Sequence, residues 1–492
     1  MSAGTTVRPN RPQALRGDLL VQTRRDQLQA YRFQNRRALA ALVTGQPNVV
    51  EPPMRRLTVT TISGIMIAVL VTVGFALFGF IRPKTGDAWK AAGAIVSEQD
   101  TGARYLYDGQ TDTLYPVSNY TSAVLAVAGN QKPHEEIVDR DDLKGVKRGP
   151  TIGVPGLPDT IPKKNDLVSF PVAVCSRQQG KGDASDDLTA KVSLALGSDD
   201  GARLLSNNSG VIVNTGGNTT QYLLTNGRRY AIKNNQVTFN LTLDTTRPLQ
   251  VGTAFLSGVP AGPDLGTPSI PNQGQLTGLQ IDGRTPRVGQ LLSTHNRYRV
   301  VLSDGVASVN DVEAALLKTL PIGAGGRPLN PLAASGGAAN NLQPSSAWST
   351  IESQVFGQLP STVPRADQSA GDAGGICLVY RSSSEQPLFG VPKSLIPNFH
   401  NNGVSESQQS LQSIADQVEI TYGKGALVKA EGEAKTVFLV DDSQQRFAAK
   451  NSDVLKALGY GDVKPLELSA QLLRLIKQGP AMDPGAVRKP TG

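Results

Sequence analysis

The longest hydrophobic stretch of the chain runs from Leu57 to Ile81, where twenty-five consecutive residues carry no charge. A helix needs about twenty apolar residues to cross the ~30 Å hydrocarbon layer of a bilayer. The stretch starts too far into the chain, and is too long, for the roughly 7–15 residue apolar core of a signal peptide. A core helix of a soluble protein is rarely so uniformly apolar. The pattern therefore predicts one transmembrane helix over residues 57–81.

A shorter amphipathic pattern precedes this stretch and predicts a helix over residues 24–43 in a segment 24–56 that ends in a proline-containing linker. At about 100° per residue, Tyr31 and most of the leucines share one face, whereas Phe33 points away from it. Such a basic helix could lie on the membrane, dock onto a partner or be solvated, and the aromatic at position 33 favours a partner. Residues 1–23, rich in proline and arginine, are expected to be disordered.

Short strand-like runs alternate with turn signals through residues 82–492. Each of four runs of β-prone residues stops at an Asn or Asp, as before a hairpin turn. After three of these four runs, the chain resumes with an aromatic residue, at Tyr115, Tyr230 and Phe447. The four runs are 104–109, 222–227, 298–305 and 437–442.

Similar segments also recur at a distance. Phe255-Leu256 precedes Gly262-Pro263 by five residues, and Leu472-Leu473 precedes Gly479-Pro480 by the same interval. These similarities predict a diverged repeat of strand, hairpin and short helix, used three or four times. The predicted fold is a transmembrane helix, a short helical tail and an elongated α+β domain built from repeats around a central domain.

Helix-cap and loop signals complete this prediction. Asn310 and Glu313 form the spacing of a capping box, and Ser452 is the expected N-cap of a later helix. Residues 321–346 and 363–376, rich in small and polar residues, are expected to be surface loops or disordered linkers.

Charge predicts the orientation of the transmembrane helix. Residues 1–56 contain ten arginines against Asp18, Asp26 and Glu51, whereas residues 82–492 are nearly neutral. Positive flanks stay in the cytoplasm, so the N-terminus is predicted inside and the large domain outside. The arginines would also attract anionic lipid headgroups. Because the basic character belongs to the tail, it does not indicate nucleic-acid binding by the large domain.

The chain has two cysteines, Cys175 and Cys377, both in the predicted exported part. A pair of cysteines in an oxidising compartment is expected to form a disulfide, and two unrelated buried thiols are the alternative. The sequence has no CxxC spacing that would indicate a redox or zinc site.

Motifs for catalysis or cofactor binding are absent from the sequence. The three histidines, His134, His295 and His400, are far apart and lack a metal-ligand spacing. Neither a G-x-S-x-G nucleophile motif nor a G-x-x-x-x-G-K-[ST] phosphate loop occurs. We therefore expect no catalytic, metal or cofactor residues in this chain.

Several ordered segments resemble the EccB family, membrane subunits of type VII (ESX) secretion systems. In the tail, Gln29 to Phe33 followed by Arg36-Arg37 is similar to that family's cytoplasmic helix motif. Gly153 to Pro158, followed by Cys175, and the segment at Cys377 are similar to its proline-glycine and cysteine segments. Together with the closing Leu472-Leu473 and Gly479-Pro480, the matches span about residues 27–488.

The resemblance implies a structural subunit of a secretion complex in the inner membrane, with a periplasmic C-terminal domain that self-associates. The implied partners are EccC, EccD, EccE and the mycosin protease, with the energy supplied by EccC. A disulfide between the two cysteines would staple the domain. Alternatives are an ATPase, a label that some family members carry, and a peptidoglycan-binding anchor. The implied partner-binding residues are Tyr31, Arg32, Phe33, Arg36 and Arg37.

Overall fold

The computed structural model divides into two compact units, residues 1–86 and residues 87–492. The predicted disordered tail, residues 1–23, lies outside the described residues. The structure describes residues 24–45, 53–81, 87–128, 131–180, 188–216, 220–244, 247–295, 297–357, 359–393, 414–432 and 435–491.

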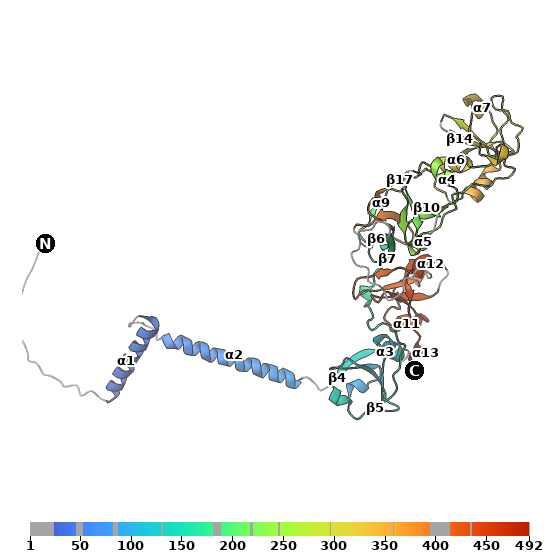
Figure 1. Ribbon diagram of the computed structural model, residues 1–492. Coiled ribbons are helices and arrows are strands. Elements are labelled where there is room, and N and C mark those ends of the chain that lie inside the picture. Colours follow the sequence, from blue (N-terminus) through green and yellow to red (C-terminus); the bar gives the residue numbers. More distant parts are fainter. Residues whose placement is uncertain are drawn as a thin grey trace, which may run out of the picture. The chain divides into compact units, whose positions relative to one another are not determined.

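The described part of the first unit consists of two helices, α1 (Arg24–Thr44) and α2 (Pro53–Ile81) (Figure 1). The first matches the helix predicted over residues 24–43. The second ends where predicted but starts at Pro53 rather than at Leu57. Proline is well suited to the first position of a helix, because the N–H that it lacks would have no partner there.

Four of the five sheets among the described residues of the second unit share one strand order. Three consecutive antiparallel strands are followed by a short helix, and a fourth strand then pairs in parallel with the first. Parallel pairing needs a crossover connection, and the helix lies in it. We name these sheets, each with its helix, modules 1 to 4 in chain order.

The bounds of the modules are as follows. Module 1 contains β1 (Ala94–Glu98), β2 (Arg104–Asp108), β3 (Thr113–Pro116), α3 (Tyr120–Val127), β4 (His134–Val138) and β5 (Lys147–Arg148). Module 2 contains β9 (Ser209–Thr215), β10 (Gln221–Thr225), β11 (Arg228–Ile232), α4 (Asn235–Asn240) and β12 (Leu249–Val251). Module 3 contains β13 (Leu291–Thr294), β14 (Arg297–Val301), β15 (Val306–Val309), α6 (Asp311–Leu317) and β16 (Leu332–Ala333). Module 4 contains β21 (Ala426–Ala430), β22 (Val437–Val440), β23 (Gln445–Ala448), α11 (Ser452–Ala457), β24 (Leu466–Leu468) and β25 (Lys477–Gln478).

The four strand-like runs of the sequence are the second strands of the four modules, β2, β10, β14 and β22. The hairpin predicted at Asn226-Gly227 is confirmed, because β10 ends at Thr225 and β11 begins at Arg228. Both turn residues have positive φ, 48° and 63°, which a two-residue hairpin of type I′ requires. The aromatics at which the chain resumes are on the third strands.

An asparagine caps the helix of every module. The side chains of Asn119, Asn234, Asn310 and Asn451 accept hydrogen bonds from backbone N–H groups of the first helical turn. The predicted capping box of Asn310 and Glu313 is confirmed. The prediction of Ser452 as the cap is wrong, because that residue is already within the helix. The Val454 N–H instead donates to the side-chain Oδ1 of Asn451.

A six-stranded sheet of different topology connects the modules. Its strand order is β20-β7-β6-β18-β19-β8. Its strands come from three distant parts of the chain. Modules 2 and 3 lie in the sequence between β8 and β18, module 1 precedes this central sheet, and module 4 follows β20. The strands are β6 (Val172–Gly180), β7 (Leu188–Leu196), β8 (Arg203–Leu204), β18 (Gly375–Tyr380), β19 (Leu388–Val391) and β20 (Gln417–Glu419).

Hydrophobic cores join the modules in pairs. Modules 1 and 4 share one core, to which Leu125 and Leu427 both belong. Modules 2 and 3 share another, which contains Val237 and Leu316. The central sheet packs on modules 2 and 4 in a third core, where Phe255 of α5 (Thr253–Gly258) and the leucines of α12 (Ala470–Arg474) are buried.

Two segments predicted as loops or disordered linkers contain regular structure, so these predictions are wrong in part. Residues 321–346 include β16 and α7 (Gly336–Asn340). Residues 363–376 include β17 (Arg365–Ala366), α9 (Ser369–Asp372) and the first residues of β18. Their small residues pack where tertiary neighbours are close: Ala370, for example, is fully buried in the central core. The remaining elements are α8 (Trp348–Ile351), α13 (Pro484–Val487), a π-helix (Glu352–Phe356) and 3-10 helices at Ala88–Lys90, Arg140–Leu143, Lys164–Asp166 and Ala324–Gly326.

Candidate anchor and assembly surfaces

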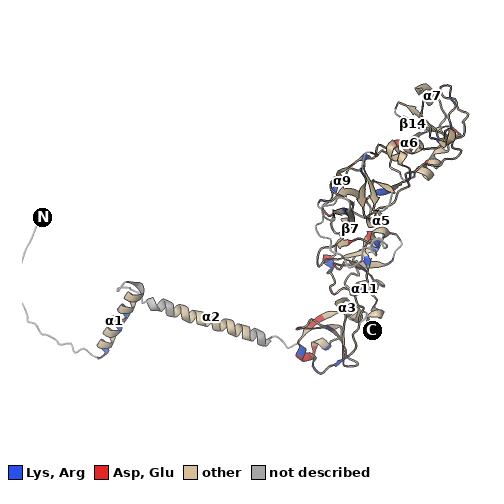
Figure 2. Cartoon of the chain, viewed as in Figure 1, with Lys and Arg blue, Asp and Glu red and all other residues tan. Residues whose placement is uncertain are grey.

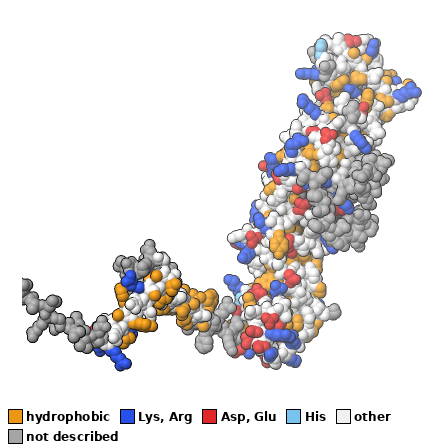
Figure 3. Space-filling model, turned by 60° about the vertical axis from the view of Figure 1, so that its left-hand side comes forward, with side chains coloured by type: hydrophobic (Ala, Val, Ile, Leu, Met, Phe, Trp, Pro, Cys, Tyr) orange, Lys and Arg blue, Asp and Glu red, His pale blue; other side chains and the backbone are white. Residues whose placement is uncertain are grey.

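The helix α2 has the length and composition to cross a membrane, and it is the one such helix among the described residues. Side chains from Thr58 to Ala76 are all exposed, and they include large apolar groups such as Ile62 and Phe75. Figure 2 shows no charge along this described part, and Figure 3 shows its apolar surface. An uncovered apolar surface of this extent is unfavourable in water and favourable in hydrocarbon. By length and composition, α2 is therefore the candidate membrane segment.

The five predicted partner-binding residues all lie on α1 and are all exposed. Tyr31 and Phe33 are 64% and 62% exposed, which is unusual for aromatic side chains without a partner surface. The guanidinium of Arg37 lies 5.8 Å from the centre of the Phe33 ring, one helical turn away. The leucines of the predicted apolar face, such as Leu42, are exposed as well. The helix thus presents aromatic and cationic groups together, on more than one side.

Cys175 and Cys377 form a disulfide in the centre of the second unit. They lie directly opposite each other on the antiparallel strands β6 and β18, with Cα atoms 4.0 Å apart. Both side chains are buried. Because 202 residues separate them, the bond closes a loop that contains modules 2 and 3.

A buried polar cluster lies beside the disulfide. Arg177, on the same strand as Cys175, is 2% exposed, pairs with Asp200 and donates to the Ser193 hydroxyl at 2.9 Å. Burial lowers the pKa of the Arg177 guanidinium, and it raises the pKa of the Glu419 carboxyl on β20, while the mutual attraction of the two charges opposes both shifts. The cluster links β6, β7 and β20 across the central sheet.

Sequence reasoning missed this cluster, although the strand period carries a signal for it. Side chains alternate between the faces of a strand, so Arg177 lies on the same face as Cys175, two residues earlier. A charged side chain on the buried face of a strand requires a buried partner. That partner could not be identified from the sequence, because Asp200 and Glu419 come from distant segments.

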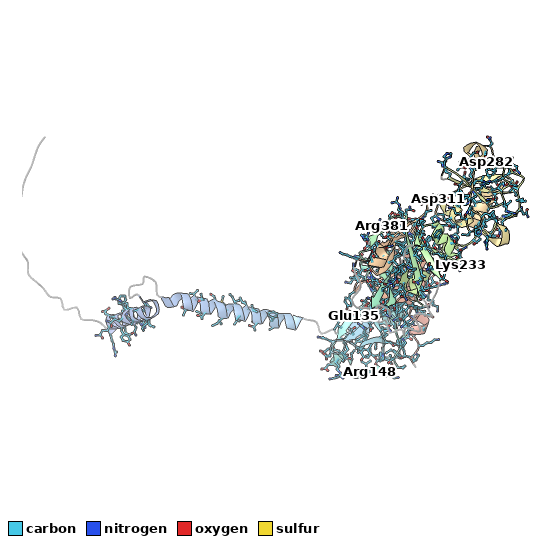
Figure 4. The ribbon with its side chains drawn as sticks, turned by 45° about the horizontal axis from the view of Figure 1, so that its top comes forward. Glu135, Arg148, Lys233, Asp282, Asp311 and Arg381 are labelled. Atoms are coloured by element: carbon cyan, nitrogen blue, oxygen red, sulfur yellow. A yellow bond between two sulfur atoms is a disulfide. The ribbon has the colours of Figure 1, made fainter. Side chains whose placement is uncertain are left out.

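Chemically reactive groups do not converge on a catalytic arrangement in the described residues. His134 and His295 are in modules 1 and 3, and His400 lies outside the described residues. The group of three potential metal ligands that the described residues bring together is Cys175, Asp200 and Cys377, whose sulfur atoms are bonded to each other. The charged residues labelled in Figure 4 are likewise spread along the second unit, from Glu135 and Arg148 in module 1 to Asp282 and Asp311 near module 3.

Within the part of the chain that the structure describes, these features define a protein with one helix suited to a membrane and, C-terminal to it, a large multi-sheet domain with a central disulfide. The sequence matches the family described as "Type VII secretion system ESX-1, transport TM domain B" over residues 20–489. The chain therefore belongs to this family, EccB, as its motifs indicated.

Curated relatives carry names from the same secretion systems. The ESX-5 secretion system ATPase EccB5 of Mycobacterium tuberculosis is 28% identical over 358 residues, which cover 70% of this chain and 64% of the relative. This alignment thus spans less than two thirds of the relative. The ESX-3 secretion system ATPase EccB3 of Mycolicibacterium smegmatis is 26% identical over 489 residues, covering 94% of this chain and 89% of the relative.

Solved structures share the fold. A chain of the intact ESX-5 inner membrane complex superposes with a TM-score of 0.62 at 24% identity, covering 97% of each chain. The EccB3 dimer from the ESX-3 core complex gives a TM-score of 0.60 at 23% identity, covering 80% of this chain and 99% of the other. The architecture of the second unit is therefore one that this family uses in assembled complexes.

Proposed function

We propose that this chain is a structural subunit of a type VII secretion complex in the inner membrane, with α2 as its anchor. The observation that carries this proposal is the continuity of the family match. It begins before α1, runs through α2 and ends near the end of module 4. The family match thus covers α1, α2 and the disulfide-bonded second unit together, and it is not confined to a single module.

The proposed topology places α1 in the cytoplasm and the second unit in the periplasm. The arginine-rich segment before α2 supports this orientation, as does a disulfide, which persists in an oxidising compartment. Because both native cysteines are bonded and buried, an engineered cysteine would report its own side of the membrane. In intact cells, a membrane-impermeant maleimide should label Lys435→Cys and leave Gln34→Cys unlabelled until the cells are lysed. The reverse pattern would overturn the topology.

We propose that α1 binds the cytoplasmic parts of EccC, EccD or EccE, and that the second unit associates with other copies of itself and with the mycosin protease. The exposed Tyr31 and Phe33, with their neighbouring arginines, are residue types that commonly anchor protein interfaces. Similar solved structures support association, because one is an inner membrane complex and another is an EccB3 dimer.

Purification of the tagged chain in mild detergent, followed by native gels and mass spectrometry, would test this scaffold role. We expect EccC and EccD in one large complex with the wild-type chain. Replacing Tyr31, Arg32 and Phe33 with Ala should deplete these partners, whereas the matched change of Gln27 and Gln34 on the same helix should not. A chain that migrates alone would contradict the proposal.

We further propose that modules 1 to 4 are diverged copies of one repeat. Their shared strand order, asparagine caps and second-strand turn signals support this interpretation. A glycine-proline pair after the fourth strand recurs in modules 1, 2 and 4, at Gly149, Gly262 and Gly479. In module 1 the same five-residue interval separates Leu143 from Gly149, but Asp142 stands where the other two segments have Phe255 and Leu472, so the apolar pair is incomplete there.

An energising role is the second candidate, favoured by the word ATPase in the names of the relatives. The printed sequence contains no G-x-x-x-x-G-K-[ST] phosphate-binding loop, which would be expected of a P-loop ATPase. ATP turnover by the purified chain, persisting after EccC has been removed completely, would support this role and contradict a purely structural one.

A further inference from the structure

A cleft of about 870 Å³ lies where module 1 meets module 4, between the helices α3 and α11. Its floor is apolar and includes Val124 and Leu458, which are buried, and Ile161, which is half-buried. The ring of Tyr120, at the start of α3, forms part of one wall. The volume is within the range of about 300–1,000 Å³ that is typical of ligand-binding clefts.

The rim of this cleft is cationic. Lys132, Lys163 and Lys456 line it together with one acidic residue, Asp453. The ammonium of Lys456 is 3.1 Å from the Asp453 carboxylate, so these two charges neutralise each other. Within the described residues, no carboxylate lies within ion-pair distance of Lys132 or Lys163, and both are exposed. In the part of the chain that the structure describes, two positive charges at the cleft thus lack a countercharge at ion-pair distance.

The corresponding junction between modules 2 and 3 is closed by a direct contact. The Asn240 side chain of α4 donates a hydrogen bond of 2.9 Å to the carbonyl of Ala315 on α6. Counted from the capping asparagine, the same position is Leu125 in α3 and Ala457 in α11. Neither residue can form this bond, so the junction of modules 1 and 4 lacks the amide bridge and has a lysine-rimmed cleft instead.

We propose that this cleft binds an acidic peptide segment that carries apolar side chains. The carboxylates would pair with Lys132 and Lys163, and an apolar side chain would occupy the floor formed by Val124, Ile161 and Leu458. An apolar floor alone would select no charge, and the lysines alone would bind any anion. Their combination favours a peptide that alternates acidic and apolar residues, and this binding function is additional to the scaffold role.

Fluorescence anisotropy on the purified full-length chain in detergent would test the site, with a fluorescein-labelled Glu-Leu-Asp-Leu-Glu peptide as the probe. The comparison peptide is Lys-Leu-Lys-Leu-Lys, and empty micelles correct for partitioning. We expect the acidic probe to bind more tightly than the basic one. The double variant Lys132→Glu and Lys163→Glu should weaken binding by about tenfold or more, since exposed ion pairs contribute modestly each and the change reverses two of them.

The matched control is Lys147→Glu with Lys435→Glu, which reverses two exposed lysines of modules 1 and 4 away from the cleft. It should bind the probe as the wild type does. All substituted residues are exposed, and an unchanged circular dichroism spectrum would verify folding. Lys132→Gln with Lys163→Gln, which removes charge without reversing it, should give an intermediate loss.

Three results would overturn the proposal. The acidic probe could fail to bind at millimolar concentration, or bind no better than the basic peptide, or bind the cleft variant as tightly as the control. Vesicles of phosphatidylglycerol test whether the cleft binds an anionic lipid headgroup instead of a peptide. If they bind with the same dependence on Lys132 and Lys163 while the peptide does not, the ligand is a lipid headgroup and the peptide proposal is wrong.

Discussion

Close approach of backbone to an aromatic ring explains the glycines that recur in the modules. The N–H groups of Gly149, Gly262 and Gly479 donate to carbonyls of third strands, at Leu114, Arg229 and Arg446. The aromatic residue that follows each carbonyl, such as Phe447, then lies against the glycine. A Cβ atom on Gly149 or Gly479 would be 2.5 Å from a ring carbon, which is inside van der Waals contact. Glycine is needed here for space, and the backbone conformation is ordinary.

The variant Gly479→Ala tests this explanation at the scale of one residue. Because its methyl group would displace the Phe447 ring in the shared core, we expect destabilisation of about 1–3 kcal/mol. Gly278→Ala is the matched control, since a Cβ there meets nothing within 4 Å. The thermal unfolding midpoint of the purified chain measures both. Equal midpoints for the two variants would contradict the steric account.

The hydrogen bonds to Asp304 predict how the stability of the fold changes in acid. The hydrogen bond from the Ser345 hydroxyl, with further bonds from Ser346 and Ala347, lowers the pKa of Asp304 to about 2. A pKa that is lowered on folding means that the carboxylate stabilises the fold above its ordinary pKa of 3.8 and ceases to do so as the pH falls to about 2. In Asp304→Asn, this part of the pH dependence should disappear. Unfolding midpoints measured from pH 5 to pH 2 would show it, and parallel curves for the two proteins would refute it.

At the scale of elements, the helices of the modules are too short to be stable by themselves, because helices shorter than about twelve residues are marginal in water. Each has an asparagine cap and a buried face. In α6, for example, the capping box satisfies the first backbone donors, and residues Val312 to Leu317 are all buried. Local capping therefore fixes where each helix starts, and packing on the neighbouring sheet stabilises it.

Replacing Asn451 or Ser452 by Ala distinguishes the actual cap of α11 from the predicted one. Asn451→Ala removes the 3.1 Å hydrogen bond to the Val454 N–H and should cost about 1 kcal/mol of unfolding free energy. Ser452→Ala should have little effect, since that exposed residue lies within the helix. Denaturant unfolding of both variants is the measurement, and the opposite ranking would show that the serine is the cap after all.

At the scale of the molecule, the central sheet depends on contacts between segments far apart in the chain. The strands β6 and β18 pair across an interval that contains modules 2 and 3, and β20 joins the sheet from still further along. All six residues of β18 are buried, so it lies within the core and not at an edge. The disulfide joins these strands at their centre and thereby limits the freedom of the unfolded chain.

Removing the disulfide should therefore destabilise the second unit strongly. Without the bond, the unfolded chain regains the conformational entropy of a loop of 202 residues, and this lowers the free energy of unfolding by roughly 5 kcal/mol. We expect Cys175→Ala with Cys377→Ala to unfold at much lower urea concentration and to become sensitive to trypsin in the central sheet. Treatment of the native chain with dithiothreitol under non-denaturing conditions is the control, since the buried bond should resist it. Unchanged urea unfolding of the double variant would show that the bond is dispensable.

Much of the architecture was determined by local sequence. The apolar stretch of α2, the Asn-Gly hairpin and the capping box of α6 were all predicted, because each depends on residues that are neighbours in the chain. The cytoplasmic-helix motif was recognised as a resemblance, and the structure shows its side chains exposed; their partners stay a prediction. The segment 363–376 was misread, because glycine and serine that pack in a core have the same composition as a loop.

The sequence by itself thus determined the long apolar helix, the helix over residues 24–43, the Asn226-Gly227 turn, the start of α6 and the family, since their causes lie within a few residues or in ordered motifs. The tertiary structure alone decided the central sheet, the partners of Arg177, the pairing of modules 1 with 4 and 2 with 3, and the cleft between α3 and α11. Strand pairing and the burial of a charge depend on which distant segments meet, and that follows from the packing of the whole domain.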